Sequence, residues 1–167
     1  MALLRAARGL GLNDWAIGAG FVRAAVWDRL SRVSAPTPLA DVDVLYFDHR
    51  RLDRGCEQRH QRRLLRHDPA VPWSVKNQAR MHKNNHERPY RSTDNAISRW
   101  IETPTCVAVR LEADDTVTLL APHGVDDLLA LRTRPTPAAR RKPAVYRRRL
   151  KAKNWRRLWP RLVVRMT

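Results

Sequence analysis

A short apolar run that begins with two acids constrains this chain more than any other feature. Residues 40–48 read ADVDVLYFD, and the β-branched and aromatic side chains predict a buried strand over residues 41–47. Because side chains alternate along a strand, Asp41 and Asp43 project from the same face. Two charges side by side on a core strand need either solvent or a cation. The pattern therefore indicates a solvated strand end or a metal site.

A glycine turn precedes this strand. Residues 15–17 predict a short strand, Gly18–Ala19–Gly20 a tight turn, and residues 21–33 a helix with apolar side chains at helical spacing. Gly18 and Gly20 would let the backbone approach a ligand closely, and the free N–H groups of a helix start favour phosphate. Arg23, about one turn into the helix, is placed to reach such an anion. The alternative is a plain tight turn, because neither GK[ST] nor GxGxxG is present.

The glycine turn, Arg23 and the acid pair together describe a metal–nucleotide site. Two carboxylates plus substrate phosphates are the usual way in which a protein holds Mg²⁺. We therefore expect Asp41 and Asp43 to bind Mg²⁺, with a nucleotide as the bound partner. Gly18, Gly20 and Arg23 are the expected phosphate-binding residues.

A polar segment, VKNQARMH, follows the next expected strand. Lys76, Asn77 and Arg80 fall at a strand-to-helix junction, where polar side chains converge on a cleft. Lys76 or Arg80 would contact phosphate, and Asn77 a base or ribose. The alternative is that Asn77 caps a helix while Arg80 pairs with an acid. His82 and His86 stand four apart without an HExxH motif, so no zinc site is expected.

The remaining pattern predicts an α+β fold, with a small mixed β-sheet flanked by helices. An amphipathic helix opens the chain, and Ser92 or Thr93 begins another helix. Residues 105–124 are expected to hold a hairpin of two alternating strands around Ala113–Asp115. A Pro- and Arg-rich stretch at residues 132–143 is expected to be an extended linker. The last helix is expected over residues 144–159.

Basic charge is concentrated at the C-terminus. The formal net charge is +17, yet residues 132–167 hold 14 Lys or Arg and no acid, which leaves 19 basic against 16 acidic residues in 1–131. We therefore expect a nearly balanced domain over 1–131 and a basic linker and helix over 132–167. The helix charges, interleaved with Trp155 and Trp159, suit RNA contact. Alternatively, and preferred here, the tryptophans dock onto the domain.

No apolar run is long enough for a membrane span or a signal peptide, so no membrane contact is expected. Two cysteines, Cys56 and Cys106, form no disulfide framework and favour buried thiols in a reducing cytoplasm.

Several strings, in this order, resemble a bacterial family of nucleotidyltransferase-like proteins within the polymerase-β-like superfamily. They are IGAGFVR, DVDVLYFD, WSVKNQARMH, PYRSTDNAISRW, APHGVDDLLALRTRP and KNWRRLWPRL, and the resemblance covers residues 12–165. It implies a minimal nucleotidyltransferase fold with a basic C-terminal helix. Gly18 and Gly20 match the glycine element, and Asp41 and Asp43 match the metal-binding acids. The resemblance implies that these two acids are the catalytic carboxylates, with Mg²⁺ or Mn²⁺ as the bound ion and an NTP as the partner. Arg23 resembles the arginine of a related signature in tRNA nucleotidyltransferases.

The superfamily also carries a third carboxylate on a neighbouring strand. Members of the family that this chain resembles carry an acid at the position of Ser74. Glu112, Asp114 or Asp115 of the hairpin are the candidates to supply the third carboxylate instead. The resemblance implies a metal-dependent transfer of NMP from an NTP to an unidentified acceptor hydroxyl, on protein, RNA or a small molecule, with release of pyrophosphate. The alternative is a nucleotide- or RNA-binding module that keeps the fold without turnover.

Overall fold

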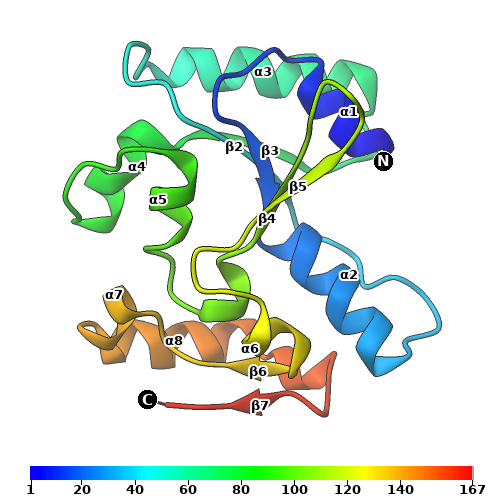
Figure 1. Ribbon diagram of the computed structural model, residues 1–167, viewed down its shortest axis with the longest axis vertical. Coiled ribbons are helices and arrows are strands. Elements are labelled where there is room, and N and C mark those ends of the chain that lie inside the picture. Colours follow the sequence, from blue (N-terminus) through cyan, green and yellow to red (C-terminus); the bar gives the residue numbers. More distant parts are fainter. Residues whose placement is uncertain (167) are drawn as a thin grey trace.

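A five-stranded mixed sheet forms the centre of the computed structural model, which describes residues 1–166 (Figure 1). The strands lie in the order β3-β2-β1-β4-β5; β2 and β3 are parallel, and the other pairs are antiparallel. Their bounds are β1 (Ala16–Gly18), β2 (Val42–Tyr46), β3 (Trp73–Asn77), β4 (Ala108–Leu111) and β5 (Val117–Leu120). The predicted α+β fold with a small mixed sheet is confirmed.

Eight helices and two 3₁₀ turns surround the sheet within the described residues. The helices are α1 (Ala2–Arg8), α2 (Gly20–Ser31), α3 (Arg54–His67), α4 (Gln78–Asn85), α5 (Thr93–Ile97), α6 (Asp126–Leu129), α7 (Pro137–Arg140) and α8 (Pro143–Lys153). Figure 1 shows α1 and α3 at one end of the molecule and α7 and α8 at the other. Ser92, one of two predicted caps, accepts a hydrogen bond from the Asn95 amide and begins α5.

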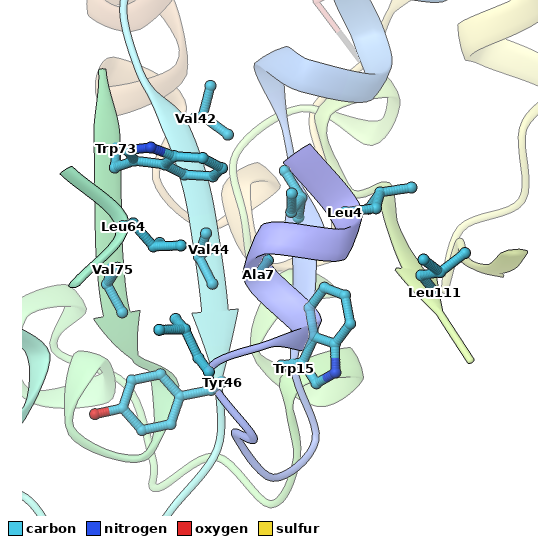
Figure 2. Packing of buried hydrophobic residues seen from close by; sticks show 12 residues of the cluster. Leu4, Ala7, Trp15, Val42, Val44, Tyr46, Leu64, Trp73, Val75 and Leu111 are labelled. Atoms are coloured by element: carbon cyan, nitrogen blue, oxygen red, sulfur yellow. The ribbon is translucent and has the colours of Figure 1, made fainter. Parts of the chain in front are cut away.

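Strand alternation divides the side chains of β2 between two faces. Val42, Val44 and Tyr46 belong to the main core, together with residues of α1, α3 and β3 (Figure 2). Burying such side chains is worth about 1.5–3 kcal/mol each. Because this face is fixed by packing, Asp43 and Leu45 must point to the opposite face of the sheet.

The C-terminal segment folds back onto α2. Trp155 and Trp159 are buried, and their rings meet Trp27 edge-on at centroid distances of 5.6 and 5.0 Å. Trp159 also donates from Nε1 to Asp28 Oδ1 at 2.8 Å. Of the two interpretations of these tryptophans, the structure therefore agrees with docking onto the domain.

Two sequence expectations for this segment are wrong. The stretch at 132–143 is not an extended linker, because β6 (Arg132–Thr133) pairs with β7 (Val163–Val164) and α7 lies within it. The last helix ends at Lys153 rather than running to residue 159, because Asn154 adopts a left-handed conformation (φ 42°, ψ 42°). Asparagine tolerates that conformation better than most residues, and the break turns Trp155 and Trp159 toward α2.

No helix among residues 1–166 is long and apolar enough to cross a membrane. Both cysteines are free and buried.

Candidate active site

A cleft of about 770 Å³ opens on the face of the sheet opposite the main core. Its floor comes from alternate residues of the two parallel strands. The walls come from α4, α7, α8 and the segment that follows α5. The register pairs Asp43 with Ser74 and Leu45 with Lys76, so these four side chains share one surface. Asp41, just before β2, also lines the cleft. The prediction that both acids project to the same side is confirmed.

The two carboxylates are not paired directly with a basic side chain. Within residues 1–166, neither Asp41 nor Asp43 forms an ion pair. Burial raises the pKa of Asp43, and the neighbouring charge of Asp41 raises it further; Ser74, Lys76 and Lys153 act in the opposite direction. A partly buried, unpaired acid pair beside a polar cleft fits a divalent cation, whose hard charge prefers carboxylate oxygens.

The glycine turn lies at the edge of the cleft, but its middle residue is the one that lines it. Ala19 lines the cleft with φ 50° and ψ −114°, a conformation that favours glycine, and it precedes the first turn of α2. Gly18 has a packing role, because a Cβ there would lie 2.8 Å from Leu45 Cδ1. Sequence reasoning missed Ala19; its position between two glycines was the only signal.

Arg23 lies behind the cleft wall. The side chain is 8% exposed and its guanidinium carbon lies 4.4 Å from the ring centre of Trp155 and 5.5 Å from that of Trp27. Among residues 1–166 its Nε finds no hydrogen-bond partner. Burial lowers the pKa of Arg23 from its ordinary value to about 10, while the charges of Glu102, Asp41 and Asp43 counteract this. The charges of the acid pair thus act on the guanidinium, but Trp155 and Trp27 cover it, and the phosphate contact expected of Arg23 stays a prediction.

The three residues predicted to meet at the strand-to-helix junction, Lys76, Asn77 and Arg80, lie in different surroundings. Lys76 lines the cleft. Asn77 is buried on the other face of the sheet, caps α4 through the Ala79 amide at 3.1 Å, and does not line the cleft. Arg80 donates from Nε to Glu57 Oε1 at 2.7 Å. The nucleotide contacts expected of Asn77 and Arg80 are therefore wrong, because strand alternation turns Asn77 away and the buried Glu57 holds Arg80.

The hairpin acids do not replace the missing third carboxylate. Asp115 pairs with Arg8 at 2.7 Å and with Arg5 of α1, on the far side of the sheet from the cleft, and Glu112 pairs with Arg110. Glu112, Asp114 and Asp115 do not line the cleft. Across residues 1–166, no group of three or more His, Cys, Asp or Glu side chains could hold a metal ion.

Several cleft residues were missed because only the folded chain brings them to the site. Arg99 and Trp100 follow α5, and the C-terminal segment contributes three basic side chains: Lys142, Arg148 and Arg149. The basic composition of residues 132–167 was visible in the sequence, but the way in which that segment folds back was not.

The geometry matches known nucleotidyltransferases. Residues 5–164 match the nucleotidyltransferase family, so the chain belongs to that family. A solved structure, determined by NMR and described as revealing a CCA-adding enzyme head domain, aligns with a TM-score of 0.89 and 33% identity. That alignment covers 100% of this chain and 89% of the other. The family and the polymerase-β-like fold expected from the sequence are confirmed.

A second solved structure, a tRNA-processing enzyme in an apo form, aligns with a TM-score of 0.59 and 18% identity. The alignment covers 96% of this chain but 44% of the enzyme, so it shows a shared fold. No curated protein matches the chain.

Proposed function

We propose that this nucleotidyltransferase moves NMP from an NTP to an acceptor hydroxyl and releases pyrophosphate, with Asp41 and Asp43 holding Mg²⁺ or Mn²⁺. One observation carries the proposal: the two carboxylates share the cleft face of β2, no basic side chain within residues 1–166 pairs with them, and the start of α2 lies beside them. Family membership supports the class of reaction.

The reaction needs positioning and charge neutralisation more than covalent chemistry by the protein. The acceptor oxygen bonds to the α-phosphorus, the bond from that phosphorus to the bridging oxygen breaks, and pyrophosphate leaves with the electron pair. The hydroxyl proton is released to solvent. A bound divalent ion supplies neutralisation of the phosphate oxygens and lowers the pKa of the attacking hydroxyl. The start of α2, from Gly20 onward, offers backbone N–H groups to the phosphates, whereas the Ala19 amide donates to the Val107 carbonyl at 2.9 Å.

Transfer of radiolabel tests this function. The protein is incubated with α-labelled NTPs, Mn²⁺ or Mg²⁺, and total cell extract, and label is sought on protein, RNA and small molecules. We expect Asp43→Asn to lose transfer by about 100-fold or more, as expected for removing one electrostatic group of a transition-state site. Asp48→Asn is the matched control, since Asp48 lies two residues beyond Tyr46, outside the cleft lining. Equal labelling by wild type and Asp43→Asn would overturn the proposal.

Ser74 favours a second candidate function. The superfamily acid on the neighbouring strand is commonly the base, and here its register position opposite Asp43 carries a hydroxyl. A nucleotide- or RNA-binding module without turnover would keep the fold and lose that acid. Calorimetric binding of NTP and Mg²⁺ without label transfer to any fraction would favour this alternative.

RNA is the acceptor class that the surface charge supports best. Exposed basic residues cover α8 and the turn after it: Arg147, Arg148, Lys151, Lys153, Arg156 and Arg157. We expect RNA affinity to fall steeply with salt, since each phosphate contact with single-stranded RNA contributes about −0.7 to the logarithmic slope. Replacing Arg156 and Arg157 by Ala is expected to reduce the slope by about 1.4.

The matched control replaces Arg62 and Arg63, which are exposed on α3 at the other end of the molecule (Figure 1). This pair removes the same charge from the protein without touching α8. If the salt dependence of RNA affinity had the same slope for wild type and the Arg156/Arg157 variant, this segment would not contact RNA. A protein or a small molecule would then be the favoured acceptor.

A further inference from the structure

The C-terminal segment gives the cleft more positive charge than the acid pair balances. Five basic side chains line the cleft against three carboxylates. The basic residues are Lys76, Arg99, Lys142, Arg148 and Arg149, and the acids are Asp41, Asp43 and Glu87. Three of the five basic residues come from residues 132–167. The cleft therefore suits a ligand with several negative charges.

Two of the basic residues already share one acid at the cleft edge. Lys142 Nζ lies 2.9 Å from Glu87 Oε1, and Arg99 Nη1 lies 3.5 Å from Glu87 Oε2. Arg148 is exposed and has no ion pair within residues 1–166. Because the Arg148 side chain is exposed and makes no ion pair, contact with a ligand would cost it side-chain entropy, which weakens its contribution to binding.

Arg149 is held differently from the other basic residues. Its Nε donates to both carboxylate oxygens of Glu102, at 2.7 and 3.0 Å, and Glu102 itself is 0% exposed. The carboxylate of Glu102 is fixed in turn by Thr105, whose hydroxyl lies 3.2 Å from Oε2. Only Nε is used in this way; within residues 1–166 the two Nη groups of Arg149 have no hydrogen-bond partner. The guanidinium is thus anchored by one edge and lines the cleft.

Arg23 also depends on Glu102. Of the charges near its guanidinium, Glu102 favours the charged form most, and Arg149 opposes it. The buried carboxylate of Glu102 therefore binds Arg149 directly and acts on Arg23 through its charge alone, and within residues 1–166 the Nε of Arg23, at 8% exposure, has no partner. A bound anion would complete this charge balance. Trp155 and Trp27 cover Arg23, so Arg149 is the member of the pair that a ligand in the cleft can reach.

We infer that Arg149 binds the triphosphate of the nucleotide in the cleft and that Glu102 is its positioning residue. The inference rests on the proposed function for the identity of the ligand. A guanidinium fork matches phosphate oxygens with two parallel hydrogen bonds, and one anchored in advance loses little side-chain entropy on binding. The C-terminal helix is then part of the nucleotide site, as well as a docking element.

Binding calorimetry with three probes tests this role. In the presence of Mg²⁺, Arg149→Ala is expected to weaken ATP and inorganic tripolyphosphate by about 10- to 100-fold, the range for a charge-assisted hydrogen bond. Adenosine, which has no phosphate, should bind the variant and the wild type equally. Arg147→Ala is the matched control, since Arg147 is exposed on the same helix and lies outside the cleft lining. Unchanged ATP binding by Arg149→Ala, or equal loss of adenosine, would overturn the inference.

Glu102 is tested through a double-mutant cycle. Glu102→Gln should weaken ATP binding in the wild-type background and have no further effect in Arg149→Ala, because it acts through Arg149. A purely structural role would give the same loss in both backgrounds. If Arg149→Ala unfolds, Arg149→Lys keeps the charge and should bind tripolyphosphate more weakly than wild type, because a lysine lacks the second, cleft-facing pair of donors.

The two hypotheses fail separately. If no label is transferred but Arg149→Ala still weakens tripolyphosphate, only the transferase activity is wrong. If label is transferred and Arg149→Ala binds tripolyphosphate normally, the transferase activity stands and the role of Arg149 is wrong.

Discussion

Asp43 and Ser74 are register partners on the two parallel strands, and both side chains face the cleft. The third superfamily carboxylate would belong at or beside this place. A hydroxyl there leaves the acid pair with two members, in agreement with the absence of any three-acid group within residues 1–166. The position is therefore the one at which a single substitution can test what the site lacks.

We predict that Ser74→Asp raises the rate of label transfer by about 10-fold or more, the scale of a positioned general base. The new carboxylate would lie beside Asp43, so it should also lower the melting temperature without metal and increase the stabilisation by Mg²⁺. Ser74→Asn has nearly the same shape without the charge and should change neither quantity. If Ser74→Asp and Ser74→Asn behave alike, a third acid at this position is not what limits the reaction.

The pKa of Asp43 predicts a pH-dependent effect on stability. Burial and Asp41 raise this pKa above the ordinary value of 3.8, so the folded protein holds the proton more tightly than the unfolded chain. That contribution is complete below pH 3.8 and is lost as the pH rises through the raised pKa. Asp43→Asn should therefore melt at a higher temperature than wild type at pH 7, with the difference shrinking toward acid pH.

Thermal melts from acid to neutral pH, with and without Mg²⁺, check this expectation. Mg²⁺ should raise the melting temperature of the wild type at pH 7 and leave that of Asp43→Asn nearly unchanged. A wild-type protein that is more stable than Asp43→Asn at pH 7 without metal would show that the carboxylate is compensated within the protein.

The two glycines of the turn are expected to respond oppositely to alanine. A Cβ on Gly18 would lie 2.8 Å from Leu45 Cδ1 and 3.2 Å from Trp100, so Gly18→Ala should cost about 1–3 kcal/mol of unfolding free energy. A Cβ on Gly20 meets only Arg23, at 3.7 Å, so Gly20→Ala should stabilise the helix by about 0.4–1 kcal/mol.

Urea denaturation measures both effects, and NTP binding separates packing from function. Gly20→Ala is expected to bind NTP more weakly despite its greater stability, because the new methyl group would stand beside the N–H groups of the start of α2, to which we propose that the phosphates bind. Normal NTP binding by Gly20→Ala would place the phosphates elsewhere in the cleft.

The sequence predicted those parts of the fold that depend on local pattern. Strand alternation predicted that Asp41 and Asp43 lie on one face of the sheet. Ser92, a residue type that caps helices, predicted the start of α5. The same reasoning erred at Asn77 and Arg80, because which face of β3 meets the cleft is decided by packing against α3 and by the buried Glu57. These contacts belong to the tertiary structure and leave no local pattern in the sequence.

The C-terminal part of the site could not be predicted for a similar reason. Arg149 reaches the cleft only because Glu102, 47 residues earlier in the chain, anchors it, and because Trp155 packs on Trp27. No periodicity links these residues. Resemblance to a family identified the acid pair and the glycine turn, whereas the basic wall depends on how residues 132–166 fold back.

We predict that the buried charge of Arg23 lowers the free energy of unfolding and strengthens NTP binding. The lowering of its pKa to about 10 corresponds to a net cost of roughly 3 kcal/mol for the charged form, of which the contacts with Trp155 and Trp27 return about 1–2 kcal/mol. Arg23→Met, which keeps the length and removes the charge, is therefore expected to raise the unfolding free energy by about 1 kcal/mol and to weaken NTP binding. The matched control is Arg29→Met, since Arg29 is exposed on the same helix. Urea denaturation and calorimetry measure the two effects. A destabilised Arg23→Met with unchanged NTP affinity would mean that the buried charge holds α2 against the C-terminal segment and does not serve the nucleotide.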